Sequence, residues 1–164
     1  MVTSVKIETW KSIEIGTSPK TTDELRRALE DKGRVVNHTA SIILDKITFA
    51  GKKTKVDLVK LSIQDLGFVS FDEARYVDLL ARARQSGLGL CQSESVIKLC
   101  LQDLEQTNER YLIAMEPVES DKHAGHLCIL RIFFKDGVLW LGSASFPPEA
   151  AWPMESTLIF QSLS

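Results

Sequence analysis

Cysteine is scarce in this sequence, and the spacings that cysteine chemistry uses are missing. The 164 residues include three cysteines, and no two of them are separated by only two residues. An odd number of cysteines without such a pair argues against a disulfide framework. The pattern favours free thiols in a reducing cytoplasm.

Long apolar runs are missing as well. No run approaches the roughly 18 residues that a membrane-spanning helix requires. The first twenty residues lack the apolar core of a signal peptide. We therefore expect a cytoplasmic protein that does not contact a membrane.

A nucleotide-binding loop is absent, although the segment Gly51-Lys52 resembles the end of one. That motif requires a second glycine five residues before the Gly-Lys pair, and Lys46 stands there. No predicted strand leads into the segment either. We expect no nucleotide at this position and no cofactor elsewhere.

Charge of one sign does not dominate the chain. The net charge of −2 argues against attraction of the whole protein to nucleic acid or anionic membranes. The segment 20–60 has ten basic and six acidic residues, whereas 101–164 has four basic and nine acidic residues. This asymmetry indicates either ordinary solvated faces or a surface that selects a partner. No strand interleaves basic and aromatic residues, so we do not expect a nucleic-acid partner.

The hydrophobic content of 44% suits a globular domain, and helix signals dominate the first half. Thr21 and Glu24 form a capping box, and Asn37 is a good N-cap for a second helix. Ser70 and Glu73 form another capping box before a third helix. The apolar side of this third helix is predicted to contain Ala74, Val77, Leu80 and Ala81, and Gly87 is predicted to end it.

Strand signals dominate the second half. Asp136-Gly137 between two apolar runs predicts a type I′ hairpin. We expect a single α+β domain over residues 1–164, with a mainly antiparallel sheet of about five strands and about three helices packed on one face. The segments predicted as strands are 5–15, 56–63, 96–101, 111–118, 127–134, 138–141 and 157–163.

Three segments together resemble a set of small uncharacterised bacterial proteins. They are VDLVKLSIQDLGF at 56–68, ARARQSGLGLCQSE at 81–94 and YLIAMEPV at 111–118. Members are sometimes labelled helicase, but this sequence has no Walker A motif and is too short for a motor core. The matched segments are mainly apolar framework. The resemblance implies a bacterial, cytoplasmic, single-domain protein and transfers no functional residue.

The turn at residues 87–94 contains the first candidate for chemistry, because Cys91 and Glu94 lie three residues apart just after a helix end. A cysteine nucleophile needs a base and a lowered pKa. The alternative is a buried thiol beside a carboxylate that caps the local turn. Glu116, with Glu119, follows a strand and forms either an acid–base pair or a rim of solvated charges.

Two further segments contain candidate binding residues. His123 and His126, with Asp121 and Cys128, offer zinc ligands, but structural sites usually use two separated pairs. We interpret this segment as a solvated loop and expect no metal. Trp152 lies in a proline-rich loop and is either an exposed anchor for a partner or packed onto the sheet.

These observations favour a non-enzymatic binding or adaptor domain whose partner is another protein. The missing catalytic constellation and the uneven charge are the basis of this expectation. The alternative is a small hydrolase-like enzyme with its site at the turn from Gly87 to Glu94, near Glu116.

Overall fold

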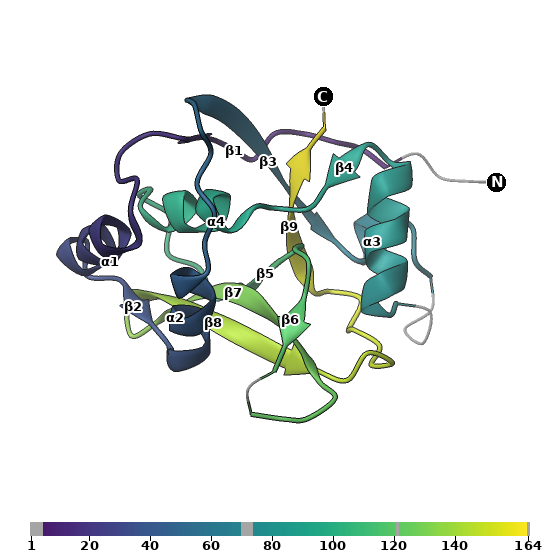
Figure 1. The fold of residues 1–164 in the computed structure, drawn as a ribbon. Helices are drawn as coiled ribbons and strands as arrows, with labels where there is room; N and C mark the ends of the chain where they lie inside the picture. Colours follow the sequence, from purple (N-terminus) through teal and green to yellow (C-terminus); the bar gives the residue numbers. More distant parts are fainter. Residues whose placement is uncertain (1–4, 70–73, 121, 164) are drawn as a thin grey trace.

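Nine strands form one mixed sheet that curls around the core, and four α-helices pack against it (Figure 1). The computed structural model describes residues 5–69, 74–120 and 122–163, and the numbers of elements refer to these residues. The helices are α1 (Thr22–Asp31), α2 (His38–Asp45), α3 (Tyr76–Gln85) and α4 (Ser93–Cys100), with a short 3₁₀ helix η1 (Gln64–Leu66). The strands are β1 (Lys11–Ile15), β2 (Val35–Val36), β3 (Thr54–Ser62), β4 (Leu88–Gly89), β5 (Tyr111–Ile113), β6 (Val118–Glu119), β7 (Leu127–Lys135), β8 (Val138–Phe146) and β9 (Thr157–Ser162).

Most neighbouring strands run antiparallel, but two pairs are parallel. The strand order is β1-β3-β9-β5-β7-β8-β2, with β4 added to β9 and β6 added to β7. β5 runs parallel to β9 in the middle of the sheet, and β2 runs parallel to β8 at one edge. The longest pairing joins β7 to β8, from Leu127 opposite Phe146 to Lys135 opposite Val138.

The expected sheet of about five antiparallel strands with about three helices on one face is therefore wrong. The described residues contain nine strands in a mixed sheet and four α-helices. Three of the strands that the sequence did not reveal (β2, β4 and β6) are two residues long, too short to produce an alternating pattern. α3 packs beside β4 at one side of the molecule, α1 and α2 lie at the other side, and α4 lies between them against β1 (Figure 1).

The segment predicted as a strand at 96–101 is instead the helix α4. Every residue from Glu94 to Cys100 is buried. A helix that is buried on all sides has no polar stripe, so its apolar run cannot be distinguished from a buried strand by periodicity. The sequence alone therefore misassigned the helix at the centre of the fold.

The third predicted helix exists as α3, but its buried face differs from the expectation. Val77 is 67% exposed, although we expected it on the apolar side. The capping box proposed at Ser70 and Glu73 lies outside the described residues. Gly87 has φ +86°, which confirms the left-handed residue after the helix. The residues that α3 buries are Tyr76, Leu79, Leu80 and Ala83.

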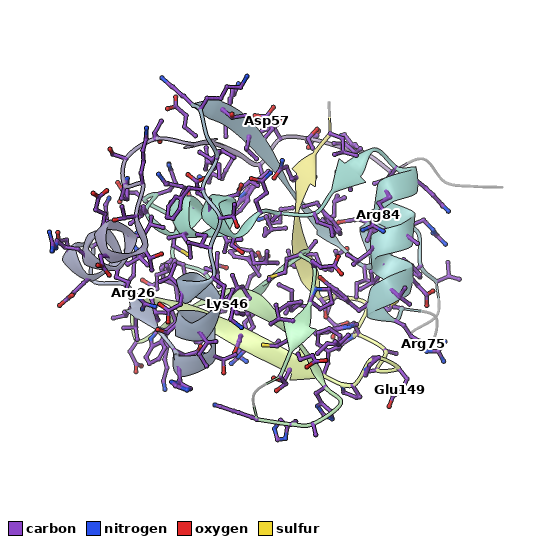
Figure 2. The ribbon with its side chains drawn as sticks, in the orientation of Figure 1. Arg26, Lys46, Asp57, Arg75, Arg84 and Glu149 are labelled. Carbon is purple, nitrogen blue, oxygen red and sulfur yellow. The ribbon has the colours of Figure 1, made fainter. Side chains whose placement is uncertain are left out.

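The first two helices begin where the capping residues predicted. Thr21 Oγ1 accepts a hydrogen bond from the Glu24 amide at 3.1 Å, and Asn37 Oδ1 accepts one from the Ala40 amide at 2.8 Å. The two helices are joined through the Arg26 guanidinium, which donates to α2 (Figure 2). Its acceptors are Ser41 and Asp45.

The two faces of the β7–β8 hairpin have different environments. One face packs on the core through five residues that are at most 1% exposed. These residues are Cys128, Leu130, Ile132, Leu139 and Leu141. The opposite face is only half-buried toward the hairpin turn, where Phe133 lies opposite Trp140 and Lys135 lies opposite Val138. The fold therefore leaves an uncovered part of the sheet at this end.

The hairpin turn gives a direct test of the backbone conformation. Asp136 has φ +52° and Gly137 has φ +77°, which confirms the predicted turn with two left-handed residues. Replacing Gly137 by valine should lower the free energy of unfolding by about 1 kcal/mol or more, because a β-branched side chain resists positive φ. Urea denaturation followed by circular dichroism measures the change.

The matched control is Gly51→Val. A Cβ at either Gly51 or Gly137 would meet no atom within 4 Å, and only Gly137 has a left-handed φ. The two variants therefore differ in backbone strain and not in crowding. Equal unfolding free energies for the two variants would contradict the assigned turn.

Candidate functional site

Glu94 lies in the first turn of α4, and its side chain is completely buried. Its Oε2 accepts a hydrogen bond from the Gly16 amide at 2.7 Å, and its Oε1 accepts one from the Ala50 amide at 2.8 Å. These amides are 78 and 44 residues away in sequence. Glu94 therefore ties two distant loops to α4 and does not cap its own turn.

Lys98 lies one helical turn after Glu94 and is the counter-ion of that carboxylate. The Nζ atom is 3.8 Å from Glu94 Oε2 and donates to the carbonyl oxygens of Thr17 at 2.6 Å and Pro19 at 3.0 Å. Burial lowers the pKa of Lys98, and the charge of Glu94 opposes this shift. Lys98 also borders a cavity of about 460 Å³. The ammonium group donates to two loop carbonyls and pairs with one carboxylate, so this lysine is arranged to hold loops and not to bind a ligand.

Cys91 is also buried, just before α4. Its Sγ donates to the Ile159 carbonyl at 3.4 Å, and its amide donates to the Ala114 carbonyl at 2.7 Å. Burial raises the pKa of Cys91 to about 12. Such a thiol is protonated at neutral pH, and the thiolate is the reactive form of cysteine.

Glu116 is exposed after β5, whereas Glu94 is completely buried. It lies near Tyr76, because its charge contributes to the raised pKa of that phenol, after the larger effect of burial. The Tyr76 hydroxyl donates to the Met115 carbonyl at 2.7 Å and accepts from the Met115 amide at 3.0 Å. Of the three catalytic candidates, Glu94 is occupied by backbone amides, Cys91 is protonated, and Glu116 is the exposed one.

The histidine segment does not gather zinc ligands among the described residues. The rings of His123 and His126 are 5.3 Å apart, but Cys128 is buried on β7 and completely inaccessible. Asp121 lies outside the described residues. In the part of the chain that the structure describes, no group of three or more histidine, cysteine or acidic side chains is placed to hold a metal ion.

Trp152 is half-buried and packs onto the sheet from the loop before β9. Its ring contacts Phe146 edge-on at 5.0 Å and Tyr76 at 6.5 Å. Its amide donates to the Ala74 carbonyl at 2.9 Å, and nearby Arg75 donates to the Glu149 carbonyl, which fastens the loop to α3 (Figure 2). The indole Nε1 is buried and has no hydrogen-bond partner among the described residues.

Two arginines whose guanidinium groups both lie against the same aromatic ring were not identified from the sequence. The guanidinium of Arg131 lies 5.1 Å from the centre of the Phe133 ring, and that of Arg110 lies 5.7 Å from it. Among the described residues, neither arginine has an ion pair or a hydrogen bond, and the buried Arg131 Nε is unpaired. An unpaired buried donor costs about 1–3 kcal/mol. Burial, followed by the charge of Arg110, lowers the pKa of Arg131.

The aromatic stack continues onto β8. The rings of Phe133 and Trp140 are 6.1 Å apart and nearly parallel, at 14°, and Lys135 lies 5.5 Å from the Trp140 ring. We call five residues the exposed sheet surface, of which Arg110 and Lys135 are exposed and Arg131, Phe133 and Trp140 are half-buried. The alternation Arg131-x-Phe133-x-Lys135 on β7 was the available sequence signal, so the statement that no strand interleaves basic and aromatic residues was wrong. Its meaning depended on the pairing with β8, which a single strand does not reveal.

A cavity of about 360 Å³ adjoins this surface. Arg110 and Arg131 belong to both, so the cavity and the exposed sheet surface are continuous. Trp152 forms part of the cavity wall, which places the tryptophan singled out from the sequence beside the two arginines. The other lining residues are Glu109, Leu112, Pro153, Glu155, Ser156 and Thr157.

Comparisons with known proteins give no relative for this chain. A scan against protein-family models found no match, and searches of curated proteins and of solved structures found none either. The resemblance to small bacterial proteins and the cytoplasmic location stay predictions. Within the described residues, no helix combines the length and the apolar character needed to cross a membrane.

Because Glu94 and Lys98 form a buried ion pair, replacing Glu94 by glutamine should strongly reduce the stability of the fold. Glu94→Gln keeps the side-chain shape but leaves the Lys98 ammonium buried without its counter-ion. We expect the free energy of unfolding to fall by about 3 kcal/mol, as for other buried pairs that lose one partner. Urea denaturation at neutral pH measures the loss.

Glu14→Gln is the control for this substitution. Glu14 pairs with Lys53 at 3.6 Å, and both side chains are largely exposed. Its loss should change stability by no more than about 0.5 kcal/mol. Similar effects of the two substitutions would show that Glu94 does not hold the loops as described.

The cysteines give a second prediction. The described structure has three free thiols, all buried, and burial raises the pKa of Cys100 as well as that of Cys91 to about 12. At pH 7 such a thiol is ionised in roughly one molecule in 100,000. A thiol reagent such as DTNB should therefore react slowly until denaturant is added. Rapid reaction in the folded protein that disappears in Cys91→Ser would contradict the burial of this residue.

Proposed function

We propose that this chain is a non-enzymatic binding domain that takes an acidic, apolar segment of another protein on the exposed sheet surface. The observation that carries this proposal is the pair of unpartnered guanidiniums, Arg110 and Arg131, stacked against Phe133. Two neighbouring positive charges without an acceptor favour a negatively charged partner.

The aromatic residues supply the apolar half of the surface. Phe133 and Trp140 form a rigid stacked pair on adjacent strands, where Lys135 adds a further positive charge. Aromatic residues and arginine are the residue types that contribute most of the energy in protein interfaces. The surface thus combines anchors for apolar side chains with charges for carboxylates.

A short acidic segment agrees with this surface better than single-stranded nucleic acid does. A nucleic acid requires many phosphate contacts along an extended basic groove. Here the exposed acidic residues Glu109 and Glu155 line the adjoining cavity, and Asp136 follows Lys135. A long polyanion would meet these carboxylates, whereas a short acidic segment contacts only the arginines and Lys135.

The test measures binding of a defined peptide by fluorescence anisotropy. The probe is a short labelled peptide of alternating glutamate and leucine, blocked at both ends, and the comparison peptide has glutamine in place of glutamate. We expect the glutamate peptide to bind more tightly, with an affinity that falls as salt is added. Lys135→Gln and Trp140→Ala should each weaken binding about tenfold.

Lys46→Gln is the matched control, because Lys46 is an exposed lysine at the end of α2 and is not one of the five residues of this surface (Figure 2). It should leave the affinity unchanged. Equal binding of the glutamate and glutamine peptides would overturn the proposal. Tighter binding of a single-stranded oligouridine than of the glutamate peptide, lost in Trp140→Ala, would replace it with nucleic-acid binding.

A further inference from the structure

We propose that the cavity lined by Arg110, Arg131 and Trp152 is the subsite for a carboxylate at the C-terminal end of the bound segment, with the last apolar side chain on the cavity floor. This inference rests on the proposed function, because the cavity opens beside the exposed sheet surface. It goes further by naming the chemical group that the cavity receives.

The two arginines provide the charge that such a group needs. Arg131 is half-buried in the middle of the sheet and its neighbour Arg110 is exposed, so the pair extends from the interior to the solvent. Arg131 Nε is buried and unpaired among the described residues. Guanidinium groups bind carboxylates through parallel hydrogen bonds, and a carboxylate between the two would offset their mutual repulsion.

The rest of the cavity is suited to an apolar side chain. Leu112 pairs with Arg131 across β5 and β7, and Trp152 and Pro153 form the neighbouring wall. A volume of about 360 Å³ is at the lower end of the range for small-ligand sites, which is about 300–1,000 Å³. This volume is large enough for the last apolar side chain of a bound segment.

The surrounding charges favour a carboxylate over a phosphate. Glu109 and Glu155 also line the cavity and are exposed. These glutamates equal the two arginines in number, so the lining holds no surplus positive charge to offset a group with two negative charges. A carboxylate adds only one charge, and its two oxygens match the fork of one guanidinium.

The experiment compares two peptides that differ only in the C-terminal group. Both have the alternating glutamate and leucine sequence and end in leucine, one with a free carboxylate and the other with an amide. We expect the free carboxylate to bind at least about tenfold more tightly to the wild-type protein, and this advantage to disappear in Arg131→Gln. Arg110→Gln, an exposed change that spares the sheet interior, should reduce the same advantage.

Arg84→Gln is the control, since Arg84 is exposed on α3 and does not line the cavity (Figure 2). It should keep the full preference for the free carboxylate.

Equal binding of the two peptides would overturn the subsite and leave the proposed binding surface intact. Failure of both peptides to bind would overturn the proposed function itself. N-acetylleucine binding as tightly as the whole peptide would assign the cavity to a free small acid and overturn the chain-end assignment.

Discussion

The buried carboxylate of Glu94 is the interaction on which the arrangement of the N-terminal half depends. A carboxylate without water costs several kcal/mol unless hydrogen bonds and a counter-ion replace the lost solvent. Glu94 obtains these from the amides of Gly16 and Ala50 and from Lys98. Gly16 directly follows β1, and Ala50 lies just before β3, so one side chain fixes both strands of an antiparallel pair against α4.

The loops that Glu94 joins also contact each other, and a glycine makes this possible. A Cβ on Gly16 would lie 2.1 Å from the Lys52 carbonyl oxygen, and Gly16 has φ +74°. Both the close approach and the left-handed backbone require glycine. Lys98 also holds the loop after β1, because its ammonium group donates to the carbonyls of Thr17 and Pro19. The buried pair thus satisfies backbone groups at the beginning of the loop that leads to α1.

Structural features that depend only on neighbouring residues could be predicted from the sequence. The caps at Thr21 and Asn37 and the Asp136-Gly137 turn are local, and each has the expected hydrogen bond or φ. Features that depend on burial on all sides, or on a partner distant in sequence, could not be predicted in this way. α4 has no polar stripe, and Glu94 was expected either to act beside Cys91 or to cap its local turn. Its partners are far away in sequence, so no local pattern pointed to them.

Strand pairing also explains why the exposed sheet surface was not identified from the sequence. Arg110 and Arg131 approach because β5 pairs with β7, and Phe133 meets Trp140 because β7 pairs with β8. A Cβ on Gly142 would lie 2.8 Å from the Phe133 ring, so a glycine on β8 makes room for the ring on which the arginines stack. The contacts of the arginines and of Trp140 with the Phe133 ring restrict these side chains before binding, which lowers the entropy cost of association. The mixed sheet therefore brings together the charges and the aromatic rings on which the proposed binding of an acidic segment depends.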